Sequence, residues 1–273
     1  MIRNVLSIAG SDPSGGAGVQ ADLKAFSARG VYGMAVLTAL TAQNTQGVSG
    51  VHLVPADFVR KQIAAVLADV RVDAIKIGMI ATAAIADAVA DALAPHKGIP
   101  VVLDPVMVAK GGAALLDPDA VSSVKRCLLP LATVITPNLP EAASLLGDQV
   151  ATDRQAMAAQ AKALVRLGAR AVLLKGGHLD SDDSPDLLAD GEGQAWLEGR
   201  RVATSNTHGT GCTLSSALAS ELAKGRSLGA AAADSKAYLA GALEAADHLS
   251  VGSGHGPVQH FHQFWVPTER TTP

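Results

Sequence analysis

The chain of 273 residues has few aromatic residues, few cysteines and no strong excess of charge. Only 3% of its residues are aromatic whereas 48% are hydrophobic, so Ala, Val, Leu and Ile must build most of the core. This composition excludes a disordered chain. The net charge of −3 lacks the basic surplus that a general nucleic-acid binder carries. Cys127 and Cys212 are too few for a disulfide framework or a zinc-ligand set, and they suit a reducing compartment.

No stretch has the length and composition of a signal peptide or of a membrane span. The apolar run Val5–Gly10 is followed almost at once by Asp12, and a signal peptide needs a longer apolar region. The segment 30–56 carries no Asp, Glu, Lys or Arg, but its apolar part ends near Ala42. A span needs about 20 apolar residues. We therefore expect a cytoplasmic protein that binds neither membranes nor nucleic acids.

Two common phosphate-binding signatures are also absent. The sequence contains no Gly-x4-Gly-Lys-Ser/Thr, so there is no P-loop, and no Gly-x-Gly-x-x-Gly follows the first apolar run. A protein of this sequence that handles phosphate must therefore use another kind of site.

Short apolar runs alternate with helical patterns along the chain, and several runs, such as 100–104, show no polar alternation. Strands of this kind are buried on both faces, which is typical of a parallel sheet between helices. We expect strands at Asn4–Gly10, Met34–Thr41, Asp73–Gly78, Pro100–Pro105, Thr133–Thr136 and Ala171–Gly176. We expect helices at Ala17–Ala28, Ala56–Val70, Ala83–Ala94, Pro118–Leu129, Leu139–Leu146, Asp153–Leu167, Gly211–Lys224 and Ser227–His248.

The segment Asp182–Val202 differs, because two short β patterns flank a Gly-Glu-Gly turn, which predicts an antiparallel hairpin at the sheet edge. No composition break, long linker or repeat divides the chain. We therefore expect one α/β domain over residues 1–273, with a mobile end to the Gly252–Pro273 tail.

A glycine-rich turn leads into one of the predicted helices, in the run His208-Gly-Thr-Gly-Cys-Thr213. Free N–H groups of Thr210, Gly211 and Cys212 at such a helix start favour an anion and can act as an oxyanion hole. The same position predicts a lowered thiol pKa and a partly exposed, reactive sulfur for Cys212. An ordinary glycine-capped helix with a buried cysteine is the alternative.

The loop after the first strand is rich in small residues, in the run Gly10-Ser-Asp-Pro-Ser-Gly-Gly-Ala-Gly18. Carboxyl ends of strands are where open α/β sheets bind ligands, and small residues let a ligand approach the backbone. The alternative is a flexible loop without a ligand.

Three polar residues follow the fourth and fifth strands. Asp104 and Glu141 are carboxylates that could hold Mg²⁺ through water, since Mg²⁺ keeps much of its hydration shell. Asn138 and Glu141 also match a capping box at a helix start, and the two roles are compatible.

Lys175 and Gln43 end two further strands. Lys175 can meet a nucleotide phosphate, and the amide of Gln43 offers a donor and an acceptor that complement an aminopyrimidine edge. Solvated polar strand ends explain both positions nearly as well. His255, His260 and His262 match no zinc spacing, and Cys127 suits a buried helix position.

Seven segments, in order, resemble the hydroxymethylpyrimidine and phosphomethylpyrimidine kinases of thiamine biosynthesis. The resemblance covers nearly the whole chain without a departure at a motif position. Its segments are 9–24, 41–45, 76–79, 135–142, 174–178, 208–217 and 256–258.

This resemblance implies a ribokinase-like three-layer fold with a mostly parallel central sheet, usually in a homodimer. It also implies ATP and Mg²⁺ as cofactors and leaves a monovalent cation possible. The implied activity phosphorylates 4-amino-5-hydroxymethyl-2-methylpyrimidine and then the resulting monophosphate, which gives the diphosphate.

The resemblance also implies a role for individual residues. Gln43 would read the pyrimidine amine and ring nitrogen, and Gly209–Cys212 would form the anion hole. Asp104 and Glu141 would organise Mg²⁺, and Lys175, with Asn138 and Thr210, would bind the nucleotide. The pyrimidine pocket would be lined by Gly10, Ala17, Met79 and Val106, with Asp22 near its polar side.

Cys212 occupies the position where sugar kinases of this superfamily carry an aspartate base. A thiolate of lowered pKa is a poor proton acceptor for an alcohol, and phosphoryl transfer asks little of a base. We therefore expect positioning and the anion hole to supply most of the rate, with Cys212 as a modest base.

Three other functions compete with this interpretation. A pyridoxal or dual-specificity kinase is the nearest, although Gln43 and Met79 favour a pyrimidine. A cysteine hydrolase or redox enzyme would use Cys212, but no acid is evident to orient His208. A non-catalytic binding protein would not need the anion-hole motif.

Overall fold

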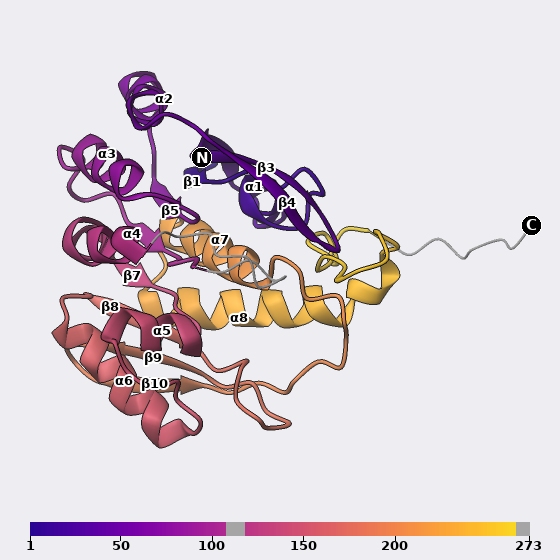
Figure 1. Ribbon diagram of the computed structural model, residues 1–273. Helices are drawn as coiled ribbons and strands as arrows, with labels where there is room; N and C mark the ends of the chain where they lie inside the picture. The colour runs from indigo at the N-terminus through magenta and orange to yellow at the C-terminus, as the bar shows by residue number, and fades with distance from the viewer. Residues whose placement is uncertain (108–117, 266–273) are drawn as a thin grey trace, which may run out of the picture.

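The computed structural model describes residues 1–107 and 118–265. An eight-stranded sheet runs through its centre in the order β10-β9-β8-β7-β6-β5-β1-β2 (Figure 1). Its strands are β1 Asn4–Ala9, β2 Tyr32–Leu37, β5 Ala74–Ile77, β6 Val101–Leu103, β7 Val134–Ile135, β8 Ala171–Lys175, β9 Asp186–Asp190 and β10 Gln194–Leu197. Six strands are parallel, and β9 and β10 form the antiparallel edge hairpin that the sequence predicts.

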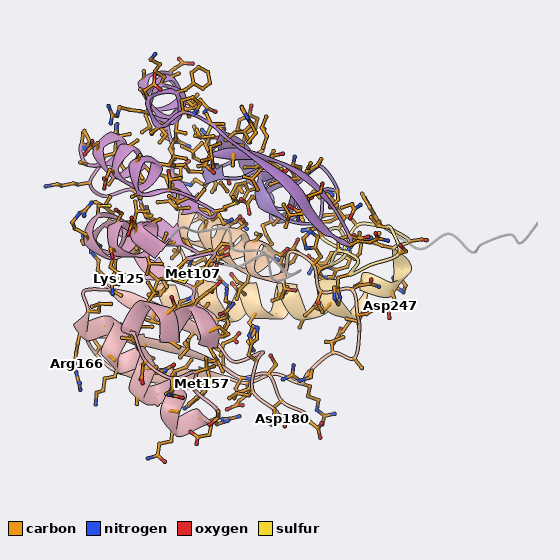
Figure 2. The ribbon with its side chains drawn as sticks, in the orientation of Figure 1. Met107, Lys125, Met157, Arg166, Asp180 and Asp247 are labelled. Atoms are coloured by element: carbon orange, nitrogen blue, oxygen red, sulfur yellow. The ribbon has the colours of Figure 1, made fainter. Side chains whose placement is uncertain are left out.

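Helices cover both faces of this sheet and make a three-layer sandwich. One face packs against α2 Ala56–Asp69, α3 Ala83–Leu93, α4 Pro118–Ser123, α5 Leu139–Leu146 and α6 Arg154–Arg166. The other packs against α1 Gly18–Ala28, α7 Thr210–Ala223 and α8 Leu228–Glu244. Both cores consist mainly of Ala, Val, Leu and Ile, as the scarcity of aromatic residues requires. Charged side chains such as Arg166 and Asp247 lie outside, whereas Met157 is buried (Figure 2).

Two predicted helices end differently in the structure. The helix predicted at Pro118–Leu129 changes after α4 into a π-helix at Val124–Leu128 and then a 3₁₀ turn at Leu129–Leu131. The last turn predicted for Ser227–His248 is a separate 3₁₀ helix at Ala246–His248. Among the described helices, none combines the length and apolar character that crossing a membrane requires.

The strand predicted at Met34–Thr41 is in fact two strands, which corrects that expectation. Buried Thr38 separates β2 from β3 Ala39–Asn44, because its N–H donates to the Ala9 carbonyl and its hydroxyl to the Met79 carbonyl. The chain then leaves the main sheet, and β3 pairs with β4 Gly47–Leu53 in a two-stranded antiparallel sheet. Gln43 therefore stands on this second sheet, beside the carboxyl ends of the main strands.

The segment after Gly252 returns along the end of this second sheet. His255 N–H donates to the Thr45 carbonyl, and His208 N–H donates to the Gly256 carbonyl. The segment thus ties β3 and β4 to the turn before α7, and the two regions lie side by side in Figure 1. The predicted mobile end of the tail, from residue 266, lies outside the described residues.

Candidate active site

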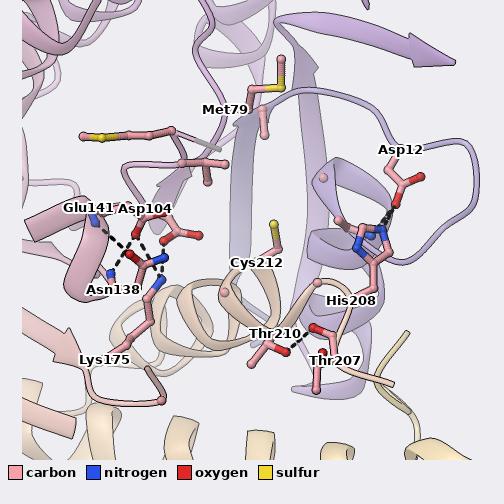
Figure 3. A pocket seen from close by; sticks show the side chains of 18 of the residues that line it. Asp12, Met79, Asp104, Asn138, Glu141, Lys175, Thr207, His208, Thr210 and Cys212 are labelled. Atoms are coloured by element: carbon pink, nitrogen blue, oxygen red, sulfur yellow. Dashed lines mark hydrogen bonds and ion pairs between the residues drawn. The ribbon is translucent and has the colours of Figure 1, made fainter. Parts of the chain in front are cut away.

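A pocket of about 780 Å³ opens at the carboxyl ends of the parallel strands, between the glycine turn before α7 and the β3–β4 sheet (Figure 3). All of the predicted site residues except Asp22 line it. They come from segments far apart in the chain, and the sheet topology brings them together. The lining set is Gly10, Ala17, Gln43, Met79, Asp104, Val106, Asn138, Glu141, Lys175, Gly209, Thr210, Gly211 and Cys212.

The predicted anion site is the N-terminus of α7. Gly209 is the N-cap in the left-handed region, with φ +78°, and a Cβ there would clash with the Gly16 carbonyl oxygen. Only glycine therefore fits where this turn meets the first loop. The Thr210 N–H, expected to be free, donates weakly to the Thr207 carbonyl at 3.4 Å, and its hydroxyl donates to the same oxygen. The amides of Gly211 and Cys212 remain as the first-turn donors that face the pocket.

Cys212 does not have the lowered thiol pKa that its helix position predicts. Burial raises the pKa of this thiol to about 11; Lys76 opposes the rise, whereas the nearby Asp22 and Asp104 carboxylates add to it. The side chain does line the pocket, between the two groups of polar residues in Figure 3. The structure therefore places a neutral thiol beside the anion site rather than a reactive thiolate.

Two carboxylates and one lysine form the other side of this anion site. Lys175 Nζ lies 3.0 Å from Asp104 Oδ1 and 3.8 Å from Glu141 Oε2. A Cβ on Gly211 would lie 3.3 Å from Lys175 Nζ, so this glycine lets the helix start approach the lysine closely. Burial alone would raise the pKa of Asp104, but Lys175 and Lys76 hold it below its ordinary value. A cation and an anion hole thus stand side by side, as transfer of a phosphoryl group requires.

Asn138 and Glu141 make the predicted capping box at the start of α5. Glu141 N–H donates to Asn138 Oδ1, and Asn138 N–H donates to Glu141 Oε2, both at 2.8 Å. Burial raises the pKa of the Glu141 carboxyl to about 7; Lys175 opposes this rise and Asp104 adds to it. Two buried carboxylates that share one ammonium group leave excess negative charge for a further cation.

The opposite end of the pocket is a narrow apolar slot. Met79, Ala39 and Ala81 form a small buried cluster, against which Val106 packs. A Cβ on Gly10 would lie 3.0 Å from Met79 Sδ, so the glycine leaves the slot open at its base. Such a slot accepts a flat ring, and Gln43 stands where the ring would need polar partners.

Asp22 lies outside the pocket, which corrects the expectation that it faces the polar side of the substrate. Its carboxylate is fully buried and accepts hydrogen bonds from Ser7 and Ser216 as well as from Lys76. Lys76, for which the sequence suggested no role, lines the pocket. A lone lysine in an apolar strand gives no sequence signal for a partner on a distant helix.

A second buried pair was also not foreseen. His208 Nε2 lies 2.8 Å from Asp12 Oδ2, as the dashed line in Figure 3 shows, and 3.4 Å from Gln43 Nε2. Burial raises the pKa of Asp12, but hydrogen bonds from His208, Ser14 and the Ala17 N–H outweigh it, so this pKa is lowered. Sequence reasoning considered His208 only as a partner for Cys212. The pair instead connects the first loop with the turn before α7.

The far end of the pocket, beyond Lys175, contains residues that sequence reasoning missed. His178, Arg200 and Arg201 line it, near the edge hairpin. Arg201 donates to the carbonyls of Gly177, Leu179 and Ser181 and so fixes the loop after β8. Two adjacent arginines after a hairpin were the available signal, but their distance from the strand ends concealed their place.

The tail histidines do not form a metal site. His260 is buried and contacts the Thr213 hydroxyl at 3.0 Å, whereas His262 lies against Tyr238. Within residues 1–107 and 118–265, no group of three or more His, Cys, Asp or Glu side chains is placed to hold a metal ion.

The fold and pocket are similar to those of solved small-molecule kinases. A pyridoxal kinase from Bacillus subtilis, solved as an ADP complex, is 38% identical with a TM-score of 0.89, covering 96% of this chain and 99% of that one. A phosphomethylpyrimidine kinase from Clostridium difficile is 41% identical with a TM-score of 0.77, covering 87% and 98%. The class that fold and site define is therefore the ribokinase-like kinases.

Sequence comparison narrows this class. The phosphomethylpyrimidine kinase family model matches residues 12–259. A hydroxymethylpyrimidine/phosphomethylpyrimidine kinase from Salmonella typhimurium is 53% identical over 262 residues, which cover 96% of this chain and 98% of that protein. The chain belongs to the phosphomethylpyrimidine kinase family.

Proposed function

We propose that this protein uses ATP to phosphorylate the hydroxymethyl group of 4-amino-5-hydroxymethyl-2-methylpyrimidine and then phosphorylates the monophosphate, which supplies the diphosphate for thiamine biosynthesis. The observation that carries the proposal is one pocket with two chemically different ends. Gln43 offers a donor and an acceptor beside an apolar slot, and the α7 N-terminus faces Lys175 across the pocket. Family membership and the overall fold agree with this assignment.

The acceptor ring would lie in the slot between Met79 and Val106, with its amine and ring nitrogen on Gln43. Its hydroxymethyl oxygen would then face the α7 N-terminus, where the Gly211 and Cys212 amides would stabilise the transferred phosphoryl group. Lys175 would neutralise nucleotide charge, and Asn138 and Thr210 would complete the nucleotide side. Because the Cys212 thiol is neutral, positioning and charge stabilisation would supply most of the rate.

The site also fits a Mg²⁺ ion. Asp104 and Glu141 supply hard oxygen ligands, and the raised pKa of Glu141 reflects burial and the neighbouring Asp104 charge, which a divalent cation would counter. We propose that these carboxylates hold Mg²⁺ through water. The ion would draw negative charge from the nucleotide phosphates when bound.

We also propose that the protein is a cytoplasmic homodimer, because ATP is available there and the β3–β4 sheet exposes Leu40, Val51 and Leu53. Light scattering coupled to size-exclusion chromatography tests this assembly. A mass of one chain across micromolar concentrations would exclude the dimer.

The test of function follows phosphate from ATP and Mg²⁺ with the hydroxymethylpyrimidine, resolving monophosphate and diphosphate over time. We expect the monophosphate to appear first and the diphosphate to follow. Monophosphate alone would leave only the first activity, and no turnover would exclude the pyrimidine assignment.

Pyridoxal kinase activity is the second candidate, because the Bacillus subtilis pyridoxal kinase has so similar a structure. A pyridoxal ring lacks the adjacent amine and ring nitrogen that complement Gln43. We therefore expect a higher kcat/KM for the pyrimidine than for pyridoxal when both are assayed side by side. Gln43→Leu should remove this preference, whereas Gln46→Leu at the exposed turn between β3 and β4 should keep it.

A further inference from the structure

Two polar side chains flank the amide of Gln43 in the pocket. Gln43 Oε1 lies 3.2 Å from Thr41 Oγ1, and Gln43 Nε2 lies 3.4 Å from His208 Nε2. The two ends of an amide have the same shape, so a half-turn of the group exchanges donor and acceptor without moving any neighbour. The protons of Thr41 and His208 therefore decide which orientation is stable.

The proton of Thr41 is already used. Thr41 Oγ1 donates to the Ser11 carbonyl at 2.8 Å, and a carbonyl can only accept. A hydroxyl has a single proton, so Thr41 offers Gln43 only lone pairs. The amide end that Thr41 stabilises is therefore the NH₂ group.

The proton of His208 Nε2 is fixed by Asp12. These two atoms lie 2.8 Å apart, and the lowered pKa of Asp12 keeps its carboxylate charged, so Nε2 must carry a proton. The histidine is held from its backbone as well, because its N–H donates to the Gly256 carbonyl and its carbonyl accepts from Val258. His208 therefore presents an N–H to Gln43, and the amide end that it stabilises is the carbonyl oxygen.

Both neighbours thus select the same orientation by independent contacts. We propose that Asp12, acting through His208, and Thr41 hold the Gln43 amide with its oxygen toward His208 and its nitrogen toward Thr41, and so determine which pyrimidine the enzyme accepts. Asp12 and His208 are then positioning residues for specificity. The inference rests on the proposed function, because it concerns the ring that Gln43 reads.

This orientation also directs the reactive group of the substrate. On the 4-amino-5-hydroxymethyl ring, the amine stands between the ring nitrogen N3 and the carbon that bears the hydroxymethyl group. The amine donates to the Gln43 oxygen on the His208 side, and N3 accepts from the Gln43 nitrogen on the Thr41 side. The hydroxymethyl group consequently lies on the His208 side, and His208 directly precedes the Gly209–Cys212 turn.

The 4-oxo analogue of the substrate presents the reverse pattern, with an acceptor oxygen at C4 and a donor N–H at N3. Against a fixed amide both hydrogen bonds are lost and two acceptors and two donors are opposed. Sites built around a substrate hydrogen bond reject an unmatched analogue strongly. We expect the natural chain to prefer the amino compound over the oxo compound by about 10²-fold or more in kcat/KM.

The test compares this preference in Asp12→Asn and in a matched control. An asparagine offers both a donor and an acceptor, so it no longer forces the proton onto His208 Nε2, and the Gln43 amide can turn. We expect the amino-to-oxo ratio of kcat/KM to fall at least about tenfold. Ser14→Ala is the control, because Ser14 donates to the other oxygen of the same carboxylate and should leave the ratio unchanged.

A ratio that stays constant in Asp12→Asn while both activities fall together would overturn the proposal, because a merely structural role lowers both substrates equally. Thr41→Val provides a second measurement that does not depend on the Asp12 variant folding, and it should also lower the ratio. Failure of the unmodified enzyme to phosphorylate the amino compound would overturn the proposed function itself, and this proposal with it.

Discussion

Lys76 Nζ lies 2.9 Å and 3.0 Å from the two oxygens of the Asp22 carboxylate, and neither side chain is exposed. The pair connects β5 with α1 directly beneath the pocket, and Ser7 and Ser216 donate to the same carboxylate. Burial lowers the pKa of Lys76, but Asp22 and the neighbouring Cys212 and Asp104 outweigh it and keep the ammonium charged. The pocket floor is therefore a closed ionic network.

Removal of the lysine should unfold the protein readily. Lys76→Met leaves the Asp22 charge buried without its partner, which costs about 3–5 kcal/mol in the free energy of unfolding. Urea unfolding measures this loss. Lys61→Met is the control, because Lys61 pairs with Asp57 on the exposed face of α2 and should change stability by less than about 1 kcal/mol. Equal losses in both variants would contradict a special role for the buried pair.

Replacement of Cys212 should slow the reaction only moderately. Because its thiol is neutral near pH 7, we expect Cys212→Ala to lower kcat about 10²-fold, the low end of general-base effects. Cys127→Ala is the control, since this cysteine has a similarly raised thiol pKa but does not line the pocket. Steady-state kinetics at saturating substrates gives both values. A loss beyond about 10⁴-fold in folded Cys212→Ala would identify the thiol as a much stronger base.

The glycine at the start of α7 should be irreplaceable, unlike the glycine that follows this helix. Gly209 and Gly225 both have positive φ, at +78° and +83°, so alanine strains both backbones by about 1 kcal/mol. Only at Gly209 would the new Cβ also meet the Gly16 carbonyl oxygen. We expect Gly209→Ala to lose at least about 10²-fold in kcat, as for a lost oxyanion donor, and Gly225→Ala to keep it. Similar kcat values would show that the turn tolerates displacement.

Stability should depend on the protonation of Glu141. Its pKa is about 7 in the folded protein and 4.5 ordinarily, so the folded state binds the proton more tightly. The resulting stabilisation is complete below about pH 4.5 and is lost as the pH rises through about 7. Glu141→Gln should remove this part of the pH profile, whereas Glu192→Gln at an exposed turn should keep it. Urea unfolding between pH 4.5 and 8 measures the difference, and parallel profiles for the natural chain and Glu141→Gln would refute it.

The sequence predicts most of the fold because the central strands are uninterrupted apolar runs. It does not predict the break at Thr38, since an apolar run continues on both sides of that residue. The break depends on hydrogen bonds to Ala9 and Met79, which lie on other strands. Long-range partners of this kind leave no periodic pattern in the chain.

Much the same distinction applies to the site. Motif residues at strand ends, such as Asp104 and Lys175, could be placed together because parallel strands share one edge. The thiol pKa of Cys212 was predicted wrongly, since the argument from the helix terminus took no account of burial among Asp22 and Asp104. The Asp12–His208 pair spans loops almost two hundred positions apart and was beyond any local signal.

The backbone bonds between His208 and residues 256–258 have a consequence for synthesis on the ribosome. The sheet strands and α7 emerge first, but the turn that carries the phosphate site receives its supporting segment only after residue 258 has left the exit tunnel. A nascent chain that stops short of this point would hold a nearly complete core without a fixed acceptor pocket. Catalytic competence is thus among the last properties that translation confers on this molecule.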